Sequence, residues 1–173
     1  MKINFIKNNK NNIFLIILIS LINAIFYNIY FNNIIYADAN EYNLLAKNLL
    51  QGYFSLEEIN NNILSMKREP FYPFILSIIY RIFGLDTAYI YFFQIMIFTC
   101  TCLLTYFLSL EFFDKKKSFI GALLLAIIPT LANYSSYLLT ESLFTFLLVL
   151  FTYLLTIAIK ENNFLYFLFS GII

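Results

Sequence analysis

Apolar residues gather into long stretches that short polar segments separate, and the lengths of these stretches predict the fold. Four runs of about twenty residues lie at 13–31, 88–110, 118–137 and 140–159. At about 1.5 Å per helical residue, each run can cross a hydrocarbon core of roughly 30 Å. We therefore predict an all-α, polytopic transmembrane helical bundle that forms one domain over residues 1–173.

The polar region 32–87 contains two shorter elements. Residues 38–51 have a helical period, with one apolar face and an opposite polar face, made respectively of Tyr42, Leu45 and Leu49 and of Asn40, Asn43, Lys47 and Gln51. Residues 71–83 form an apolar run that reaches only about 20 Å as a helix. We expect both elements to be interfacial helices in an external loop, lying along the membrane surface rather than crossing it.

Two features modify this plan. Pro129 lies inside the run 118–137 and should bend or end that helix. A final apolar run opens at Phe164 and stops with the chain at Ile173, before it is long enough to span. A half-length helix of this kind indicates a fragment or a truncated reading frame, and so an incomplete module of a longer protein.

Composition agrees with a membrane protein. Hydrophobic residues make up 61% of the chain and charged residues 12%, whereas a soluble domain has about 25% charged residues. The net charge of +1 gives no field that would attract nucleic acid. Histidine is absent, so acid–base chemistry would depend on carboxylates, Lys, Tyr or Cys.

The basic residues predict the orientation. If 71–83 does not span, the three N-terminal lysines, the Lys115–Lys117 cluster and Lys160 share the cytoplasmic side, against four basic residues in the loop 32–87. This asymmetry follows the positive-inside rule. The N-terminus is then cytoplasmic, and the loop faces outward from a bacterial-type plasma membrane.

A first group of candidate chemical residues is Asp38, Glu41 and Tyr42. Spacings of three and four place these side chains on one side of a helix, just after the first transmembrane run. A carboxylate there could accept a proton from an attacking hydroxyl group. The same spacing is also typical of a helix N-cap with an acid at its third position, and the spacing alone does not separate the two interpretations.

A second group surrounds Pro70. Lys67 and Arg68 could hold a phosphate, Arg68 through its planar fork, or could contact lipid headgroups without specificity; Tyr72 follows closely. Glu141 opens the last long apolar run, where a carboxylate is either functional or a favourable partner of the positive end of the helix.

In this order the motifs resemble the N-terminal portion of GT-C membrane glycosyltransferases, namely protein O-mannosyltransferases and lipid A aminoarabinose transferases. The matching features are Asp38-x-x-Glu41-Tyr42, Leu45-Ala46, Gly52, Arg68-Glu69-Pro70-Phe71-Tyr72-Pro73, Phe83-Gly84, Gln94, Pro129 and Thr140-Glu141-Ser142. The resemblance extends from about residue 13 to the end of the chain.

The resemblance implies a glycosyltransferase that takes a sugar from a polyprenyl-phosphate donor on the external face of the membrane. It gives Asp38 the catalytic role with Glu41 in support, and it places Tyr42, Lys67, Arg68, Tyr72 and Glu141 at the substrates. No cofactor or metal ligand set is implied, and the acceptor and a divalent cation stay open. Alternative interpretations are a non-enzymatic membrane protein, such as a transporter or assembly subunit, and an inactive truncated transferase.

Overall fold

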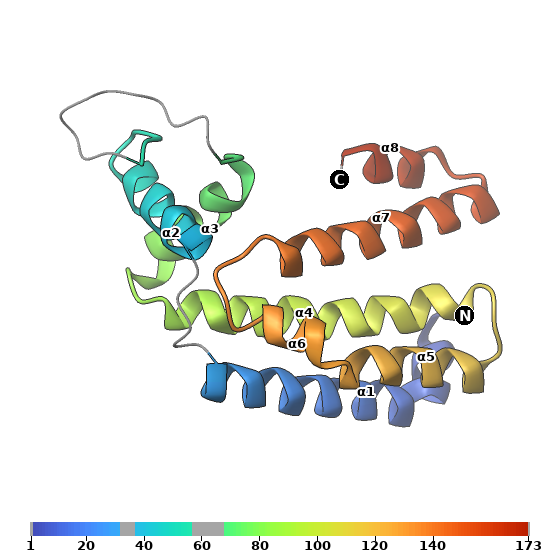
Figure 1. The fold of residues 1–173 in the computed structure, drawn as a ribbon. Helices are drawn as coiled ribbons and strands as arrows, with labels where there is room; N and C mark the ends of the chain where they lie inside the picture. Colours follow the sequence, from blue (N-terminus) through green and yellow to red (C-terminus); the bar gives the residue numbers. More distant parts are fainter. Residues whose placement is uncertain (1, 32–36, 57–67, 173) are drawn as a thin grey trace.

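The computed structural model describes residues 2–31, 37–56 and 68–172, and within these ranges its regular secondary structure is α-helical. Figure 1 shows the helices α1 (Lys2–Phe31), α2 (Ala37–Leu50), α3 (Phe71–Phe83), α4 (Ala88–Leu110), α5 (Lys115–Ile127), α6 (Pro129–Tyr134), α7 (Glu141–Glu161) and α8 (Phe164–Ile172). The predicted all-α class is confirmed. The predicted interfacial helices correspond to α2 and α3, with bounds within one residue of those expected.

Three of the described helices are long and apolar enough to cross a membrane. The spans are Asn9–Phe31 in α1, Ala88–Leu110 in α4 and Glu141–Glu161 in α7. Large apolar side chains point outward from all three, for example Phe14, Phe92 and Phe144. Such exposure is unfavourable in water but natural in lipid, so the chain is an integral membrane helical bundle.

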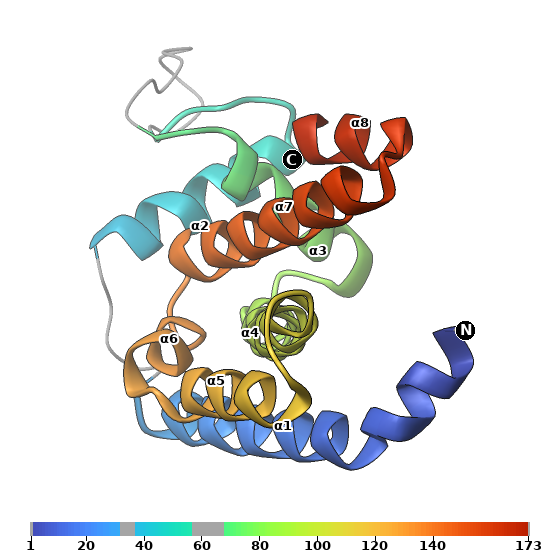
Figure 2. The ribbon, with the colours of Figure 1, turned by 90° about the vertical axis from the view of Figure 1, so that its right-hand side faces the viewer.

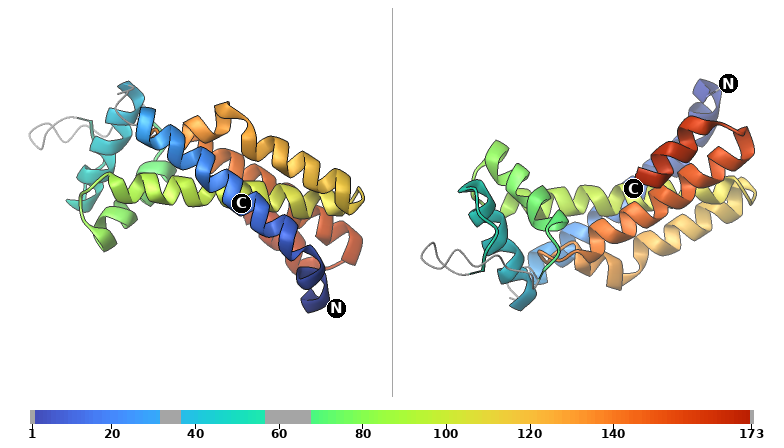
Figure 3. Two further views of the ribbon diagram at one scale, coloured as in Figure 1. Left: turned by 90° about the horizontal axis from the view of Figure 1, so that it is seen from below. Right: turned by 90° about the horizontal axis from the view of Figure 1, so that it is seen from above.

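Helix α4 is the centre of the bundle. Seen along its axis in Figure 2, it is surrounded by α1, α5, α6 and α7, and contacts with each of these helices agree. Figure 3 shows α1 crossing α4 obliquely rather than in parallel. Buried side chains form two cores, one shared by α4 with α1, α5 and α6, and one to which α2, α3, α4 and α7 all contribute.

The structure shows that Pro129 ends the helix expected over 118–137 rather than bending it. Helix α5 ends at Ile127, and Pro129 opens the separate helix α6, which ends at Tyr134. Ile128 is extended, with φ −58° and ψ 123°, as expected of a residue that precedes proline. The break frees backbone carbonyls, and Asn23 of α1 donates its side-chain amide to the carbonyl of Ala126 at 2.8 Å.

The two ends of the bundle differ in character. In Figure 1 the N-terminus, the α4–α5 turn and the α7–α8 turn gather at one end. Lys160 at the end of α7 donates to the carboxylate of Glu111 after α4 at 3.0 Å, which joins the two turns. The predicted cytoplasmic lysines near 115–117 and 160 therefore share one end, as the charge pattern requires.

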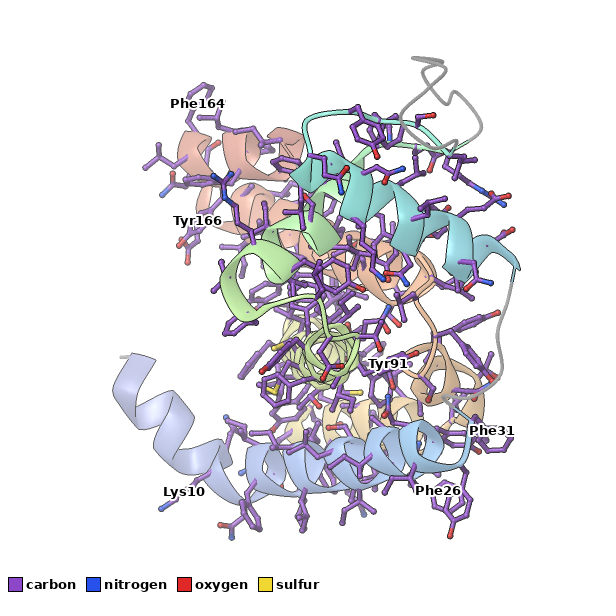
Figure 4. The ribbon with its side chains drawn as sticks, turned by 90° about the vertical axis from the view of Figure 1, so that its left-hand side faces the viewer. Lys10, Phe26, Phe31, Tyr91, Phe164 and Tyr166 are labelled. Atoms are coloured by element: carbon purple, nitrogen blue, oxygen red, sulfur yellow. The ribbon has the colours of Figure 1, made fainter. Side chains whose placement is uncertain are left out.

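Helices α2 and α3 lie together at the opposite end. Figure 4 looks at this end, where Phe31 terminates α1 and α3 lies between α2 and α4. Helix α3 stops at Gly84, whose φ of 102° is a left-handed conformation that glycine adopts without strain. Its 13 residues stay at this end, where the acidic residues Asp38 and Glu41 also lie.

Candidate functional site

The centre of the candidate site is Arg68, whose guanidinium group bridges two carboxylates of α2. Its Nε donates to Glu41 Oε2 at 2.6 Å, and its Nη2 donates to Asp38 Oδ1. Asp38 and Glu41 project from the first turns of α2, on the side that faces the segment before α3. Two of the residue groups found in the sequence, about thirty residues apart, thus form one cluster.

The N-cap interpretation of Asp38 is not what the structure shows. Helix α2 begins at Ala37, so Asp38 already lies in its first turn. The carboxylate binds Arg68 rather than a backbone amide among the described contacts. A negative charge in a first helical turn is favourable in itself, so this position holds the acid at little cost while its carboxylate pairs with Arg68.

Exposure differs among the three side chains. Arg68 and Glu41 are each 21% exposed, whereas Asp38 is 50% exposed. The hydrogen bond from Arg68 to Glu41 raises the pKa of the guanidinium group, partial burial opposes this, and Asp38 raises the pKa further. The net direction is upward, so Arg68 stays protonated at every physiological pH. Asp38 is the carboxylate that solvent or a substrate reaches more easily.

Two tyrosine rings lie beneath the ion pairs. The guanidinium carbon of Arg68 lies over the ring of Tyr42, 5.5 Å from its centroid, in cation–π geometry. Tyr42 in turn meets Tyr72 of α3 edge-on, with centroids 5.2 Å apart and an interplanar angle of 87°. Both tyrosines are buried. The Tyr42–Tyr72 pair, called the aromatic floor below, therefore forms the surface under Arg68.

Hydrogen bonds fix α2 against α3 and thereby fix the site. The hydroxyl group of Tyr80 in α3 donates to Asn43 Oδ1 in α2 at 2.6 Å. Burial raises the pKa of Tyr80, with further contributions from Tyr91 and Asp86. Because Tyr80 keeps its proton, its hydroxyl group remains a hydrogen-bond donor over the physiological pH range, and the bond links the two helices.

Tyr72 is connected to the membrane-spanning part of the bundle. Gln94 of α4 donates its side-chain amide to the hydroxyl oxygen of Tyr72 at 2.7 Å and to the carbonyl of Leu139 at 3.3 Å. Burial raises the pKa of Tyr72 well above its usual value, the hydrogen bond from Gln94 lowers it, and the charge of Glu141 raises it. Tyr72 therefore remains neutral and buried.

Glu141 occupies the first turn of α7. Thr140 Oγ1 donates to its Oε2 at 3.5 Å, and its charge is felt at Tyr72. The printed ion pairs of Arg68 are with Asp38 and Glu41, so the structure does not bring Glu141 into that cluster. Lys67 lies outside the described residues. Among the residues that are described, no group of three or more Cys, Asp or Glu side chains comes together as a metal site.

Sequence reasoning assigned no role to two residues that build the site. Gln94 belonged to the family pattern, but an amide in an apolar run does not indicate which residue it will bond to. Its hydrogen bond to Tyr72 therefore could not be predicted. Asn43 was counted only as part of the polar face of α2. Its signal was weak, since an asparagine on the polar face of an interfacial helix is ordinary.

The fold and the site together define a class, a helical membrane protein with a charged cluster at one end of its bundle. Residues 67–173 match the family described as dolichyl-phosphate-mannose-protein mannosyltransferase. This match covers more than half of the chain, and the chain belongs to that family of GT-C membrane proteins.

The chain is also similar to a protein from Aquifex aeolicus (strain VF5). It is described as an uncharacterized protein and is 30% identical over 145 residues, which cover 82% of this chain and 28% of the relative. The chain thus spans less than a third of the length of that relative. No solved structure matches the chain.

Proposed function

We propose that the chain forms the N-terminal part of a glycosyltransferase that moves a sugar from a polyprenyl-phosphate donor to an acceptor on the external face of the membrane. The observation that carries the proposal is the cluster of Asp38, Glu41 and Arg68 at one end of the bundle. Family membership supports a lipid-linked sugar donor in general, and the cluster supplies the groups that such a transfer needs.

The orientation forms part of the proposal. The α5–α6 pair runs from the lysine-rich end back toward the end that carries α2 and α3 (Figure 1). If this pair crosses the membrane, four crossings alternate, and the turn at Lys115–Lys117 shares the cytoplasm with the N-terminus. The Arg68 cluster then faces outward, at the lipid–water boundary where the phosphate of a lipid-linked donor also lies.

In this mechanism Arg68 binds the donor phosphate. Its planar fork matches phosphate oxygens, and its raised pKa keeps the positive charge constant. As the bond between the anomeric carbon and the phosphate oxygen breaks, the electron pair remains on the phosphate, and Arg68 stabilises that charge. Lys67, which lies outside the described residues, is a second proposed contact. Tyr42 and Tyr72 serve the substrate through Arg68, because both rings are buried.

Asp38 is the proposed general base. It accepts the proton of the acceptor hydroxyl group as that oxygen attacks the anomeric carbon, with inversion. Its half-exposed position suits a group that must meet an acceptor from outside. Glu41 supports it by holding Arg68 Nε, and Glu141 completes the negative surroundings of the aromatic floor. In the protein that contains this chain, Asp38→Asn should abolish transfer and leave membrane insertion intact.

Binding of undecaprenyl phosphate to the chain in lipid nanodiscs tests the proposal without requiring turnover. Arg68→Ala should weaken binding by about ten- to hundredfold, because charge-assisted hydrogen bonds to phosphate are lost. Arg81→Ala is the matched control, since Arg81 is an exposed arginine in the last turn of α3. Equal affinities of wild type and Arg68→Ala would refute the assignment of the donor site to this cluster.

A further inference from the structure

Gln94 is a buried polar side chain in the second turn of α4. The residue is 1% exposed and lies in the membrane-spanning helix α4. Polar groups at such positions are costly unless they bond to partners. Both described partners of its amide nitrogen, the Tyr72 hydroxyl oxygen and the Leu139 carbonyl, lie toward α3 and the segment before α7.

From Gln94 an unbroken series of contacts leads to the ion pairs. Tyr72 receives the hydrogen bond from Gln94 and packs edge-on against Tyr42. Tyr42 lies under the guanidinium group of Arg68. If the amide of Gln94 is removed, the buried hydroxyl group of Tyr72 loses its donor and must seek another partner. Any rotation of Tyr72 then disturbs Tyr42 and, with it, the surface under Arg68.

We propose that Gln94 is a positioning residue for Arg68. It fixes the Tyr72 ring through the 2.7 Å hydrogen bond, and the Tyr72–Tyr42 pair holds the guanidinium group where it meets both Asp38 and Glu41. Membrane-spanning helix α4 thereby sets the geometry of a site outside the membrane. The consequence for donor binding rests on the proposed function, whereas the positioning of Arg68 can be measured by itself.

A purely structural role is the alternative, in which Gln94 only joins α4 to the segment before α7 through Leu139. The chain offers a matched control for that role. Asn23 donates its side-chain amide to the Ala126 carbonyl at 2.8 Å, also within the bundle, but its described contacts do not lead to Arg68. Asn23→Leu removes an amide-to-carbonyl bond of the same kind on the other side of α4.

The test is fluorine NMR of the full chain in nanodiscs, with 3-fluorotyrosine at position 42 alone. The Arg68→Ala variant is the reference, because it shows where the fluorine resonance of position 42 lies when no cation covers the ring. Gln94→Leu should shift the wild-type resonance toward that position, and Tyr72→Phe, which keeps the ring and removes only the hydroxyl group, should do the same. Asn23→Leu should leave the resonance in place. An unmoved resonance in Tyr72→Phe and Gln94→Leu, or an equal shift in Asn23→Leu, overturns the inference.

Affinity for undecaprenyl phosphate gives the second readout. Gln94→Leu should weaken binding by about fivefold to tenfold, as expected when a buried hydrogen bond is lost, and should have no further effect in the Arg68→Ala background. Additive effects of the two substitutions contradict the inference. If wild type does not bind the lipid phosphate at all, the proposed function fails, while the fluorine resonance still decides whether Gln94 positions Arg68.

Discussion

Neutralising Asp38 should separate donor binding from sugar transfer. Without a substrate, Arg68 is shared between Asp38 and Glu41, so a donor phosphate must compete with both carboxylates for the same guanidinium group. Asp38→Asn keeps the shape of the side chain and removes one competing negative charge. We therefore expect the variant to bind undecaprenyl phosphate more tightly than wild type, although it has lost the proposed catalytic base.

The size of the gain follows from the exposure of Asp38. Its side chain is 50% exposed, so its charge acts through a largely aqueous dielectric. Two unit charges about 4 Å apart in water interact by about 1 kcal/mol, which changes an affinity by about fivefold. Salt screens exposed charges of this kind, so the gain should shrink as ionic strength rises.

The assay is binding of undecaprenyl phosphate to the chain in nanodiscs, at low and at high salt. Glu69→Gln is the control, because Glu69 is exposed and its neutralisation removes the same charge without removing either described carboxylate partner of Arg68. Its effect on affinity should be smaller than that of Asp38→Asn. If Asp38→Asn binds more weakly than wild type, Asp38 helps to hold the donor, and the reasoning from competition is wrong.

Three further predictions concern the supporting structure. Burial raises the pKa of Tyr72 well above its ordinary value of 10, so the folded chain retains a proton that the unfolded chain releases near that pH. The contribution of Tyr72 to the free energy of unfolding is then fully present below about pH 10 and falls as the pH rises further. In alkaline unfolding followed by circular dichroism, Tyr72→Phe should therefore lose less stability than wild type between about pH 9 and pH 11. Asn23→Leu should lower the free energy of unfolding by about 1 kcal/mol in thermal melts in detergent. The loss should be smaller in a Pro129→Ala background, where a continuous helix satisfies the Ala126 carbonyl. An equal loss in both backgrounds would contradict the role of Asn23 in capping that carbonyl. An added Cβ meets open space at both Gly84 and Gly121. Gly84→Ala should nevertheless lower the free energy of unfolding by about 1 kcal/mol, because the φ of Gly84 is 102°. Gly121→Ala in α5 should be neutral or stabilising in the same melts.

The sequence was sufficient for the helices whose limits are marked by physical signals. Helix α3 was predicted over 71–83 from an apolar run, and these are its limits in the structure, where it lies between Pro70 and Gly84. Helix α2 was predicted from its two-sided pattern. The spans α1, α4 and α7 follow from length and hydropathy, which depend little on the rest of the fold.

The run 118–137 shows where the pattern fails. Hydropathy is continuous across Pro129, and periodicity alone does not tell whether a proline bends a helix or ends it. In the structure the extended backbone at Ile128 ends α5, and Asn23 from a distant part of the sequence satisfies one of the freed carbonyls. That compensation is a tertiary contact, so no local signal reveals it.

The candidate site was predicted as a set of residues but not as an arrangement. Asp38, Glu41 and Arg68 were named from the sequence, and the structure brings them together. Their pairing depends on how α2 packs against α3, through contacts such as the bond between Tyr80 and Asn43. The link from Tyr72 to α4 depends on the same packing, and a sequence pattern carries no information on it.

The proposed transferase site requires that Asp38, Arg68 and Glu141 face one external compartment. Single cysteines in a Cys100→Ser/Cys102→Ser background, labelled with a membrane-impermeant maleimide on intact cells, test this directly. Asn40→Cys and Thr140→Cys should react from outside, and Lys116→Cys should react only after the membrane is permeabilised. Labelling of positions 40 and 140 from opposite faces would contradict a shared site and, with it, the proposed transferase.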